Sequence, residues 1–432
     1  MNPYSMEELI LVQMKKDTIL NHWKKIIIIA ATLMIAVGLY FILPPLLHGP
    51  GGSQSPLPSV PSVPGPAEEP EEAISLRISA VGDVMVHKSQ LPAQYDSSTG
   101  AYNFDNNFQY LTPYINQADL ALFNLETTFA GGTYTGYPAF NSPESLASAL
   151  KKAGFDVALT SNNHIMDKGL AGMKRTLEMT RKAGLATAGT RLEGEKNYSL
   201  VDVKDVKIGI VAYSYETPKV GGVPTINGSH IASEAWPLLN TFSYYNLDQD
   251  LLKVKQSIQD ARADGAELVI CYFHWGEEYQ RSPNEYQQHI ARQAAGYGAD
   301  IIFASHPHVL QGTELLDSNG RKVPVFYSMG NLISNQRLET LDNRYTEQGM
   351  IAEVDLQYMK STKQILTIDM KAVPTWVDKY KKSGKDVYAV IPLDAAMNGN
   401  PTLAESGHLS RAQQALKDIE TLLGEEYIRT AP

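Results

Sequence analysis

Two stretches decide the fold: Leu268-Val-Ile-Cys-Tyr-Phe-His274-Trp-Gly276 and Ile301-Ile-Phe-Ala-Ser-His306-Pro-His308. Both segments open with an apolar run as long as a buried strand, which His274 follows directly in the first and His306 follows after Ser305 in the second. Between them, residues 285–297 have the spacing of a helix. Strands that alternate with helices indicate an α/β fold, which gathers its ligands where the strands end. The two stretches therefore predict a histidine-containing site at the strand ends of an α/β protein.

The same pattern of apolar run and polar end recurs along the chain. The expected strands cover 75–86, 118–124, 157–160, 207–213, 268–273, 301–304, 323–327, and an antiparallel pair at 350–357 and 364–372. The expected helices cover 145–153, 169–183, 248–264, 285–297 and 404–424. Five separate strand ends carry residues of the types that bind metals.

These residue types suit a divalent transition metal. Neutral imidazole, carboxylate and amide oxygen together favour zinc, manganese or iron(II) over a calcium cage. Two histidines separated by one residue on an extended segment, as in His306-Pro-His308, would face the same side. The candidate metal ligands are Asp83, His87, Glu126, Asn163, His274, His306 and His308. This set is large enough for one ion, or for two ions that share a carboxylate.

Most of these residues also have a purely structural explanation. The His306-Pro-His308 pair could arise by chance or lie at the surface, and Glu126 could only cap the segment that follows it. Asp83 could be a turn residue after Gly82, and Asn163 or Asp167 could be a helix N-cap. His164 could be a satisfied core histidine. The recurrence of ligand-type residues at successive strand ends favours a metal site over these separate explanations.

Composition excludes several other classes of protein. The net charge of -10, from 37 Lys and Arg against 47 Asp and Glu, argues against nucleic acid as a partner. The single cysteine, Cys271, rules out an intrachain disulfide and a thiolate-rich zinc site. The sequence has no Gly-x-Gly-x-x-Gly or Walker A segment, which disfavours a nucleotide-binding fold.

An uncharged, mainly apolar run near the N-terminus predicts a membrane anchor over 26–47, long enough to span a lipid bilayer. The lysines that precede it are Lys15, Lys16, Lys24 and Lys25. No Lys or Arg follows before Arg77, so residues 1–25 are expected in the cytoplasm and the rest outside. A cleaved signal peptide is the alternative, but no small-x-small cleavage site ends the run.

The segment after the anchor, 48–74, is rich in Pro, Gly and Ser, and we expect it to be an extended tether. The remaining residues, 75–432, should form one extracytoplasmic domain at the cell membrane. This organisation predicts a single-pass protein with its N-terminus in the cytoplasm.

Six polar motifs of the chain resemble those of a known protein family. They are Gly82-Asp-Val-Met-x-His87, Asn124-x-Glu126-Thr127, Ser161-Asn-Asn-His164-x-x-Asp167-x-Gly169, His274-Trp-Gly-x-Glu278, His306-Pro-His-Val309 and Ser328-Met-Gly-Asn331. In this order, from about residue 75 to about residue 393, the chain resembles the bacterial capsule-synthesis CapA family. The membrane-anchored members of that family serve poly-γ-glutamate synthesis and are also called PgsA.

The resemblance implies a calcineurin-like metallophosphoesterase fold, a two-sheet sandwich flanked by helices. It places Asp83 as the first-motif aspartate, Glu126 as the bridging acid and Asn163 as the amide ligand. His164 takes the place of the histidine near the leaving group, and with Asp167 it is a candidate catalytic residue. The chain departs from the usual metallophosphoesterase pattern, since the first motif has three residues between Asp83 and His87 rather than one.

The resemblance implies a component of poly-γ-glutamate capsule synthesis or export. Its expected partners are membrane synthase subunits, the anionic γ-glutamyl polymer and the lipid bilayer. The chain would not be the ATP-dependent ligase, because it lacks a recognised ATP-binding loop. One alternative is a metal-dependent hydrolase of a phosphoester or of the polymer amide, with His164 as the acid. Another is a scaffold that keeps the fold without the chemistry.

Overall fold

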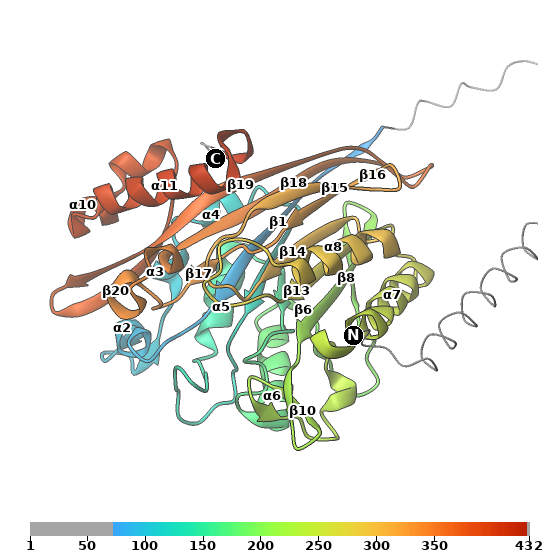
Figure 1. Ribbon diagram of the computed structural model, residues 1–432. Helices are drawn as coiled ribbons and strands as arrows, with labels where there is room; N and C mark the ends of the chain where they lie inside the picture. Colours follow the sequence, from blue (N-terminus) through green and yellow to red (C-terminus); the bar gives the residue numbers. More distant parts are fainter. Residues whose placement is uncertain (1–71, 430–432) are drawn as a thin grey trace, which may run out of the picture. The chain divides into compact units, whose positions relative to one another are not determined.

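The computed structural model describes residues 72–429, which form two large β-sheets, two small ones and the helices around them (Figure 1). The first sheet runs in the order β20 (Lys385–Pro392), β19 (Gln364–Lys382), β18 (Gln348–Met359), β1 (Ile74–Val84), β4 (Leu120–Leu125), β5 (Val157–Leu159) and β6 (Ala186–Ala188), with β17 (Asn331–Ile333) also paired to β1. Strands β1, β4, β5 and β6 are parallel, whereas β18, β19 and β20 are antiparallel.

The second sheet runs in the order β12 (Thr241–Phe242), β8 (Val206–Tyr215), β13 (Leu268–His274), β14 (Ile301–Ser305), β16 (Arg321–Phe326) and β15 (Thr313–Ser318), with β7 (Ser199–Val203) beside β8. A small three-stranded sheet follows β8 and consists of β9 (Thr217–Val220), β10 (Val223–Ile226) and β11 (Ser229–His230). We call residues 217–230 the flap. A two-stranded ribbon joins β2 (Tyr95–Asp96) to β3 (Ala101–Tyr102).

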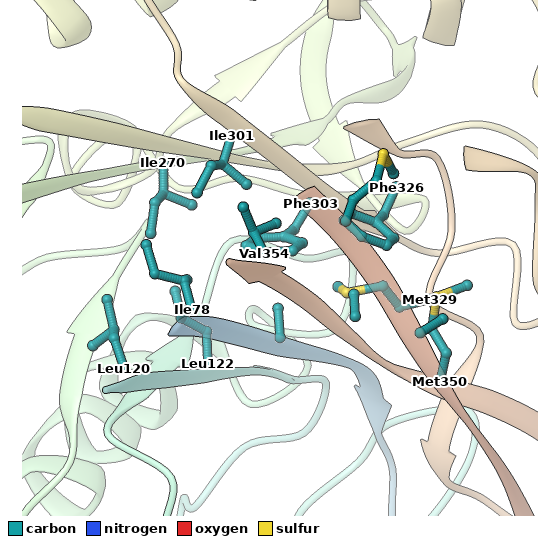
Figure 2. Packing of buried hydrophobic residues seen from close by; sticks show 14 of the residues in the cluster. Ile78, Leu120, Leu122, Ile270, Ile301, Phe303, Phe326, Met329, Met350 and Val354 are labelled. Carbon is teal, nitrogen blue, oxygen red and sulfur yellow. The ribbon is translucent and has the colours of Figure 1, made fainter. Parts of the chain in front are cut away.

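The main core lies between the two large sheets. Ile78 and Leu122 from the first sheet belong to the same buried cluster as Ile270 and Phe303 from the second (Figure 2). Burial of apolar surface is worth about 25 cal/mol per Å², so this cluster stabilises the contact between the two sheets. The sandwich confirms the predicted α/β architecture.

Helices cover the outer faces of the sandwich. On the first sheet these are α3 (Asp105–Phe108), α4 (Thr112–Ile115) and α5 (Ser145–Ala153), and on the second they are α7 (Leu247–Ala263) and α8 (Glu285–Tyr297). The remaining helices are α2 (Gln90–Gln94), α6 (Gly169–Lys182), α9 (Leu338–Leu341), α10 (Pro401–Ser406) and α11 (Leu409–Leu423). Helices α5 and α8 have the predicted bounds.

The bounds of α8 follow from its end residues. Asn284 accepts a hydrogen bond from the backbone N–H of Gln287, and the Gln287 side chain accepts one from the backbone N–H of Asn284. This capping box satisfies donors that the first turn leaves unpaired. Gly298 ends the helix at a φ of 113°, a conformation that favours glycine.

Two predictions about secondary structure were wrong. Residues 404–424 do not form one helix, because Gly407 at a φ of 72° separates α10 from α11. Strands β15, β20 and those of the flap were not expected. Most residues of β9 and β15 are exposed or half-buried, whereas β20 has a buried run from Tyr388 to Pro392 that was not recognised as a strand.

The predicted cytoplasmic segment 1–25, the anchor 26–47 and nearly all of the tether 48–74 lie outside the described residues. Within residues 72–429, no helix combines the length and apolar character required for a membrane crossing. The first strand begins at Ile74, close to the predicted start of the folded domain at residue 75.

Candidate metal centre

Strand alternation carries several predicted ligands into the space between the sheets. Leu122 of β4 faces the central core, so Asn124 and Glu126 continue the same face two and four residues later. In the second sheet Tyr272 of β13 faces the core, and His274 follows on the same side. The polar residues therefore form one end of the interior of the sandwich.

A bulge at the end of β1 brings Asp83 into the same space. The pairing of β1 with β4 shifts between Val81 and Asp83, so Asp83 lies opposite Asn124. Gly82 lies in the bulge, where a Cβ atom would come within 1.8 Å of the backbone oxygen of Gly330. Only glycine allows these two backbones to approach so closely.

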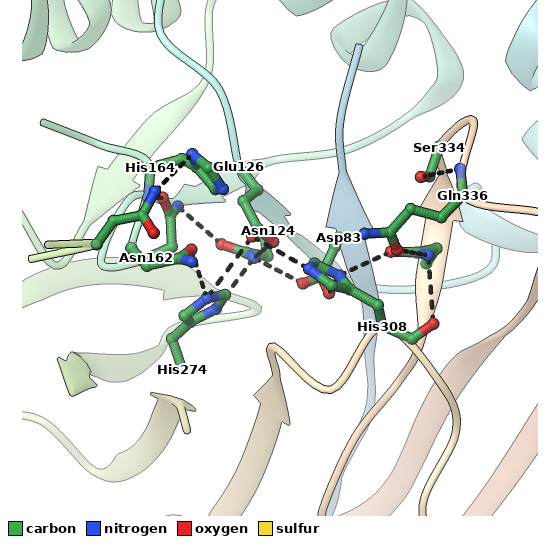
Figure 3. Close-up of polar contacts among 12 residues, drawn as sticks. Asp83, Asn124, Glu126, Asn162, His164, His274, His308, Ser334 and Gln336 are labelled. Carbon is green, nitrogen blue, oxygen red and sulfur yellow. Dashed lines mark hydrogen bonds and ion pairs between the residues drawn. The ribbon is translucent and has the colours of Figure 1, made fainter. Parts of the chain in front are cut away.

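The ligand-type atoms form two overlapping groups, and Figure 3 shows four of their five members, Asp83, Glu126, His274 and His308. The first consists of Glu126, His274 and His306, and the second of Asp83, Glu126 and His308; the ligand atoms of each group lie within 4.8 Å of one another. Glu126 Oε1 lies 3.7 Å from His274 Nε2 and 3.8 Å from His308 Nε2. Glu126 thus belongs to both groups, so its carboxylate could serve a cation in either of them.

The unpaired atoms of the cluster fit a cation. Glu126 Oε1 and His306 Nδ1 are buried, and neither has a hydrogen-bond partner among the described residues. A buried polar atom without a partner costs about 1–3 kcal/mol. A divalent ion would satisfy such atoms, and carboxylate with imidazole is a donor set that suits a transition metal.

Asp83 and His308 form a buried ion pair in the second group. His308 Nδ1 lies 3.0 Å from Asp83 Oδ2 and 3.1 Å from Asn331 Oδ1. Burial opposes charge on both groups, but their hydrogen bond and mutual attraction outweigh it, so the pKa of Asp83 is lowered and that of His308 is raised.

The first group is electrostatically different. Burial and the charge of Asp83 raise the pKa of Glu126 well above its ordinary value. Burial lowers the pKa of His306 to about 3 and holds that of His274 well below its usual range. Both imidazoles are therefore neutral at physiological pH, which is the form that binds metals.

Three amides hold the ligands in place. Asn163 Oδ1 lies 3.0 Å from His274 Nε2, and Asn124 Nδ2 donates to Asp83 Oδ1 at 2.7 Å and to Glu126 Oε2 at 3.1 Å. Asn331 contacts His308 as described above and donates from Nδ2 to the backbone oxygen of Thr346 at 3.0 Å. Partners of this kind orient ligands and tune their basicity.

The two histidines of His306-Pro-His308 do enter one site, but the extended geometry expected for them was wrong. Strand β14 ends at Ser305, and the φ angles of His306 and His308 are 107° and 56°. Positive φ costs of order 1–3 kcal/mol at a non-glycine residue, so the surrounding contacts must hold this conformation. The two rings lie 5.9 Å apart between centroids.

His164 and Asp167 form a pair beside the candidate metal ligands. His164 Nδ1 lies 2.8 Å from Asp167 Oδ2, which also accepts a hydrogen bond from the backbone N–H of Phe140 at 2.7 Å. Neither side chain belongs to the two ligand groups. The carboxylate fixes the orientation of the imidazole and leaves its Nε2 atom for other chemistry.

His87 is placed differently from the other predicted ligands. It belongs to neither ligand group of the described residues. Its Nδ1 accepts a hydrogen bond from the backbone N–H of Asn335 at 3.2 Å, and its ring packs edge-on against Phe140. The structure thus brings six of the seven candidate metal ligands together and leaves His87 at the side of the cluster.

The candidate metal ligands lie within a segment that matches a known protein family. The model of the family described as bacterial capsule synthesis protein PGA_cap matches residues 77–336, which include every residue of the cluster. The chain belongs to the PGA_cap family.

Two relatives of this PGA_cap chain come from Bacillus. The capsule biosynthesis protein CapA of Bacillus anthracis is 28% identical over 270 residues, which cover 60% of this chain and 60% of that protein. The PGA biosynthesis protein CapA of Bacillus subtilis (strain 168) is 31% identical over 268 residues, covering 60% of this chain and 64% of that protein. The match thus spans less than two thirds of either relative.

Among solved structures, the calcineurin-like phosphoesterase YfkN from Bacillus subtilis is similar to this chain at 14% identity. The overlap covers 69% of the PGA_cap chain and 90% of the other chain, with a TM-score of 0.40.

Two residues near the candidate metal ligands were not predicted from the sequence. The ring of Tyr215 lies 4.7 Å from that of His306, at the end of β8, which extends two residues beyond its predicted limit. Asn227 Nδ2 lies 3.4 Å from His164 Nδ1 and comes from the turn of the flap. No local pattern marks Asn227, because its position depends on a hairpin that the sequence did not predict.

Proposed function

We propose that this chain is a metal-dependent component of poly-γ-glutamate capsule biosynthesis or export. The observation that carries the proposal is the pair of ligand groups that share Glu126. Membership of the PGA_cap family and similarity to the two CapA proteins support the capsule assignment. The proposal includes metallophosphoesterase-like metal binding, with one or two ions of manganese, zinc or iron.

In this proposal the clustered side chains have distinct tasks. Asp83, His274, His306 and His308 would hold the ions, with Glu126 between them and Asn163 beside His274. A bound divalent ion supplies Lewis-acid polarisation of a substrate oxygen and stabilises developing negative charge. The neutral state of the His274 and His306 imidazoles, which follows from their lowered pKa values, supports this assignment.

One observation favours hydrolysis as the activity of the component. The pair of His164 and Asp167 supports an acid that protonates a leaving group, since Asp167 would hold a proton on Nδ1 and orient Nε2. The substrate would be a phosphoester or an amide of the polymer.

Asp167→Asn should lower hydrolysis without removing the metal. The purified full-length protein should contain manganese, zinc or iron and should turn over a generic phosphodiester. Loss of the Asp167 carboxylate should reduce kcat about 100-fold, the lower range for general acid catalysis, because His164 loses its orienting partner. Elemental analysis and steady-state kinetics check both expectations.

The matched control for this prediction is Asp317→Asn, an exposed carboxylate on β15 that pairs with Lys322. It should retain wild-type turnover. A wild-type protein that holds metal but hydrolyses neither phosphodiesters nor the polymer would eliminate the hydrolase and leave the scaffold.

We also propose that the chain is a single-pass membrane protein with its folded domain outside the cell. The lysines before residue 26 and their absence between 26 and 76 support this topology. Membrane poly-γ-glutamate synthase subunits and the anionic polymer are the proposed partners, along with the lipid bilayer. The net charge of -10 disfavours nucleic acid.

Protease added to intact spheroplasts should remove the domain and leave a short membrane-embedded fragment. The reason is the charge asymmetry, which keeps the lysine-rich N-terminus in the cytoplasm. Immunoblots against each end of the chain give the readout, and spheroplasts lysed before protease treatment give the control. Full protection of the domain in intact spheroplasts would reverse the topology.

A further inference from the structure

His87 is held beside the candidate metal ligands by contacts on both its backbone and its ring. Its backbone N–H donates to Gln90 Oε1 at 2.7 Å. Gly136 packs so closely that a Cβ atom there would lie 3.0 Å from His87 Cα. The ring centroid of Phe140 lies 5.1 Å from that of His87 and 4.7 Å from that of His164. His87 and His164 therefore flank the same aromatic ring.

The hydrogen bond from Asn335 determines which nitrogen of neutral His87 carries the proton. The backbone N–H of Asn335 points at His87 Nδ1, so Nδ1 is the acceptor and the proton resides on Nε2. Asn335 is itself fixed, because its Oδ1 accepts hydrogen bonds from Lys379 Nζ at 2.9 Å and from the Tyr388 hydroxyl at 2.7 Å. Burial and the nearby charge of His308 lower the pKa of His87 to about 4, which supports a neutral ring.

This tautomer is unsuited to metal ligation. A ligand nitrogen needs a free lone pair, but the lone pair of Nδ1 is engaged by Asn335 and Nε2 bears hydrogen. Moving the proton to Nδ1 would set two N–H groups against each other. The Nε2 atom of His87 has no hydrogen-bond partner among residues 72–429. It is also not one of the fully buried polar atoms of these residues that lack a partner.

His164 has the opposite arrangement on the other side of Phe140. Its Nδ1 faces the Asp167 carboxylate, so Nδ1 carries hydrogen and Nε2 can exchange a proton. The His164 imidazole can therefore relay a proton, whereas the His87 imidazole can only donate a hydrogen bond through Nε2.

We infer that His87 is a substrate-binding residue whose Nε2–H donates a hydrogen bond to an oxygen of the substrate, rather than a metal ligand. This inference rests on the proposed function, since the oxygen belongs to the group held at the metal cluster. The class of ligand is an oxygen acceptor, either a phosphoryl oxygen or a carbonyl oxygen. His87 would bind this oxygen beside His164, which gives the site a preference for substrates with an acceptor at that position.

The test compares His87→Phe with His87→Gln in the full-length protein. Phenylalanine fills the space without a donor, whereas glutamine places an amide N–H near the position of Nε2. We expect both variants to retain the metal content of the wild type. In calorimetric titrations of the metal-loaded protein, affinity for inorganic phosphate should fall about tenfold in His87→Phe, the loss of one hydrogen bond, and should largely recover in His87→Gln.

Nitrogen-15 NMR of histidine-labelled protein without added metal gives an independent readout. His87 should show the Nε2–H tautomer at neutral pH. A loss of metal in His87→Phe, unchanged phosphate affinity in that variant, or an Nδ1–H tautomer would each overturn the inference. A wild-type protein that binds no metal would instead defeat the proposed function, and the tautomer would then still decide whether His87 is built as a donor.

Discussion

Replacing Glu126 by glutamine should leave a folded protein that no longer gains stability from added Mn(II) or Zn(II). Glu126 Oε1 lies near imidazoles of both ligand groups, and an amide oxygen there lacks the negative charge that would attract a cation. Wild-type protein at a metal concentration 100 times Kd should gain about 2.7 kcal/mol, because the ion binds only the native state. Thermal unfolding with metal and with chelator measures the difference.

The metal-free form of Glu126→Gln should be at least as stable as the metal-free wild type near neutral pH. Burial and the charge of Asp83 raise the pKa of Glu126 above its ordinary value of 4.5. Without metal, this group contributes stability below that value and loses it as the pH rises through the raised pKa. Glutamine cannot ionise, so the variant should lack this decline.

Glu193→Gln is the matched control, because Glu193 is exposed and pairs only with Lys174 among the described residues. It should show the full metal-dependent gain. An unchanged gain in Glu126→Gln would mean that the cation binds elsewhere.

The position of the site could be predicted from sequence because strand alternation is local. An apolar run with a ligand-type residue at its end specifies both a buried strand and the side chain that emerges from it. This is why Glu126 and His274 were found from their strands alone. Glu126 follows a strand of the first sheet and His274 ends a strand of the second, and the two converge because both strands end at the same end of the sandwich interior.

The geometry within the site depends on contacts that no local pattern specifies. The bulge at Gly82 exists because the backbone of Gly330 passes against it, almost 250 residues later. The positive φ of His306 is likewise maintained by tertiary contacts, so the segment could not be distinguished from an extended one. The role of His87 depends on Asn335, which is remote in sequence.

Residues after position 336, where the family match ends, form hydrogen bonds with residues that contact the site. Thr346 accepts a hydrogen bond from Asn331, which contacts His308. Lys379 and Tyr388 hold Asn335, which fixes His87. The match ends at residue 336, yet the strands that follow fix the orientation of residues within it. Truncation after the matched region would therefore disturb the site as well as the first sheet.

His306→Ala should abolish surface poly-γ-glutamate in a strain that carries this variant as its only copy of the chain. His306 is one of three members of the first ligand group, and its ring contacts both His274 and Tyr215. Alanine pays the same backbone cost at a φ of 107°, so the variant should still fold. Polymer should fall to the level of the deletion strain, measured on cells with equal amounts of the protein in the membrane.

His289→Ala provides the control for this experiment, because His289 lies on α8 and pairs with the exposed Asp248. It should restore wild-type polymer, which shows that loss of an imidazole alone has no effect. The decisive comparison is with metal content. If His306→Ala is folded and free of metal and yet supports wild-type polymer, the ligand cluster is a relic. The energetic cost of burying its unpaired polar atoms would then have no functional reason, and the scaffold would replace the metal-dependent component.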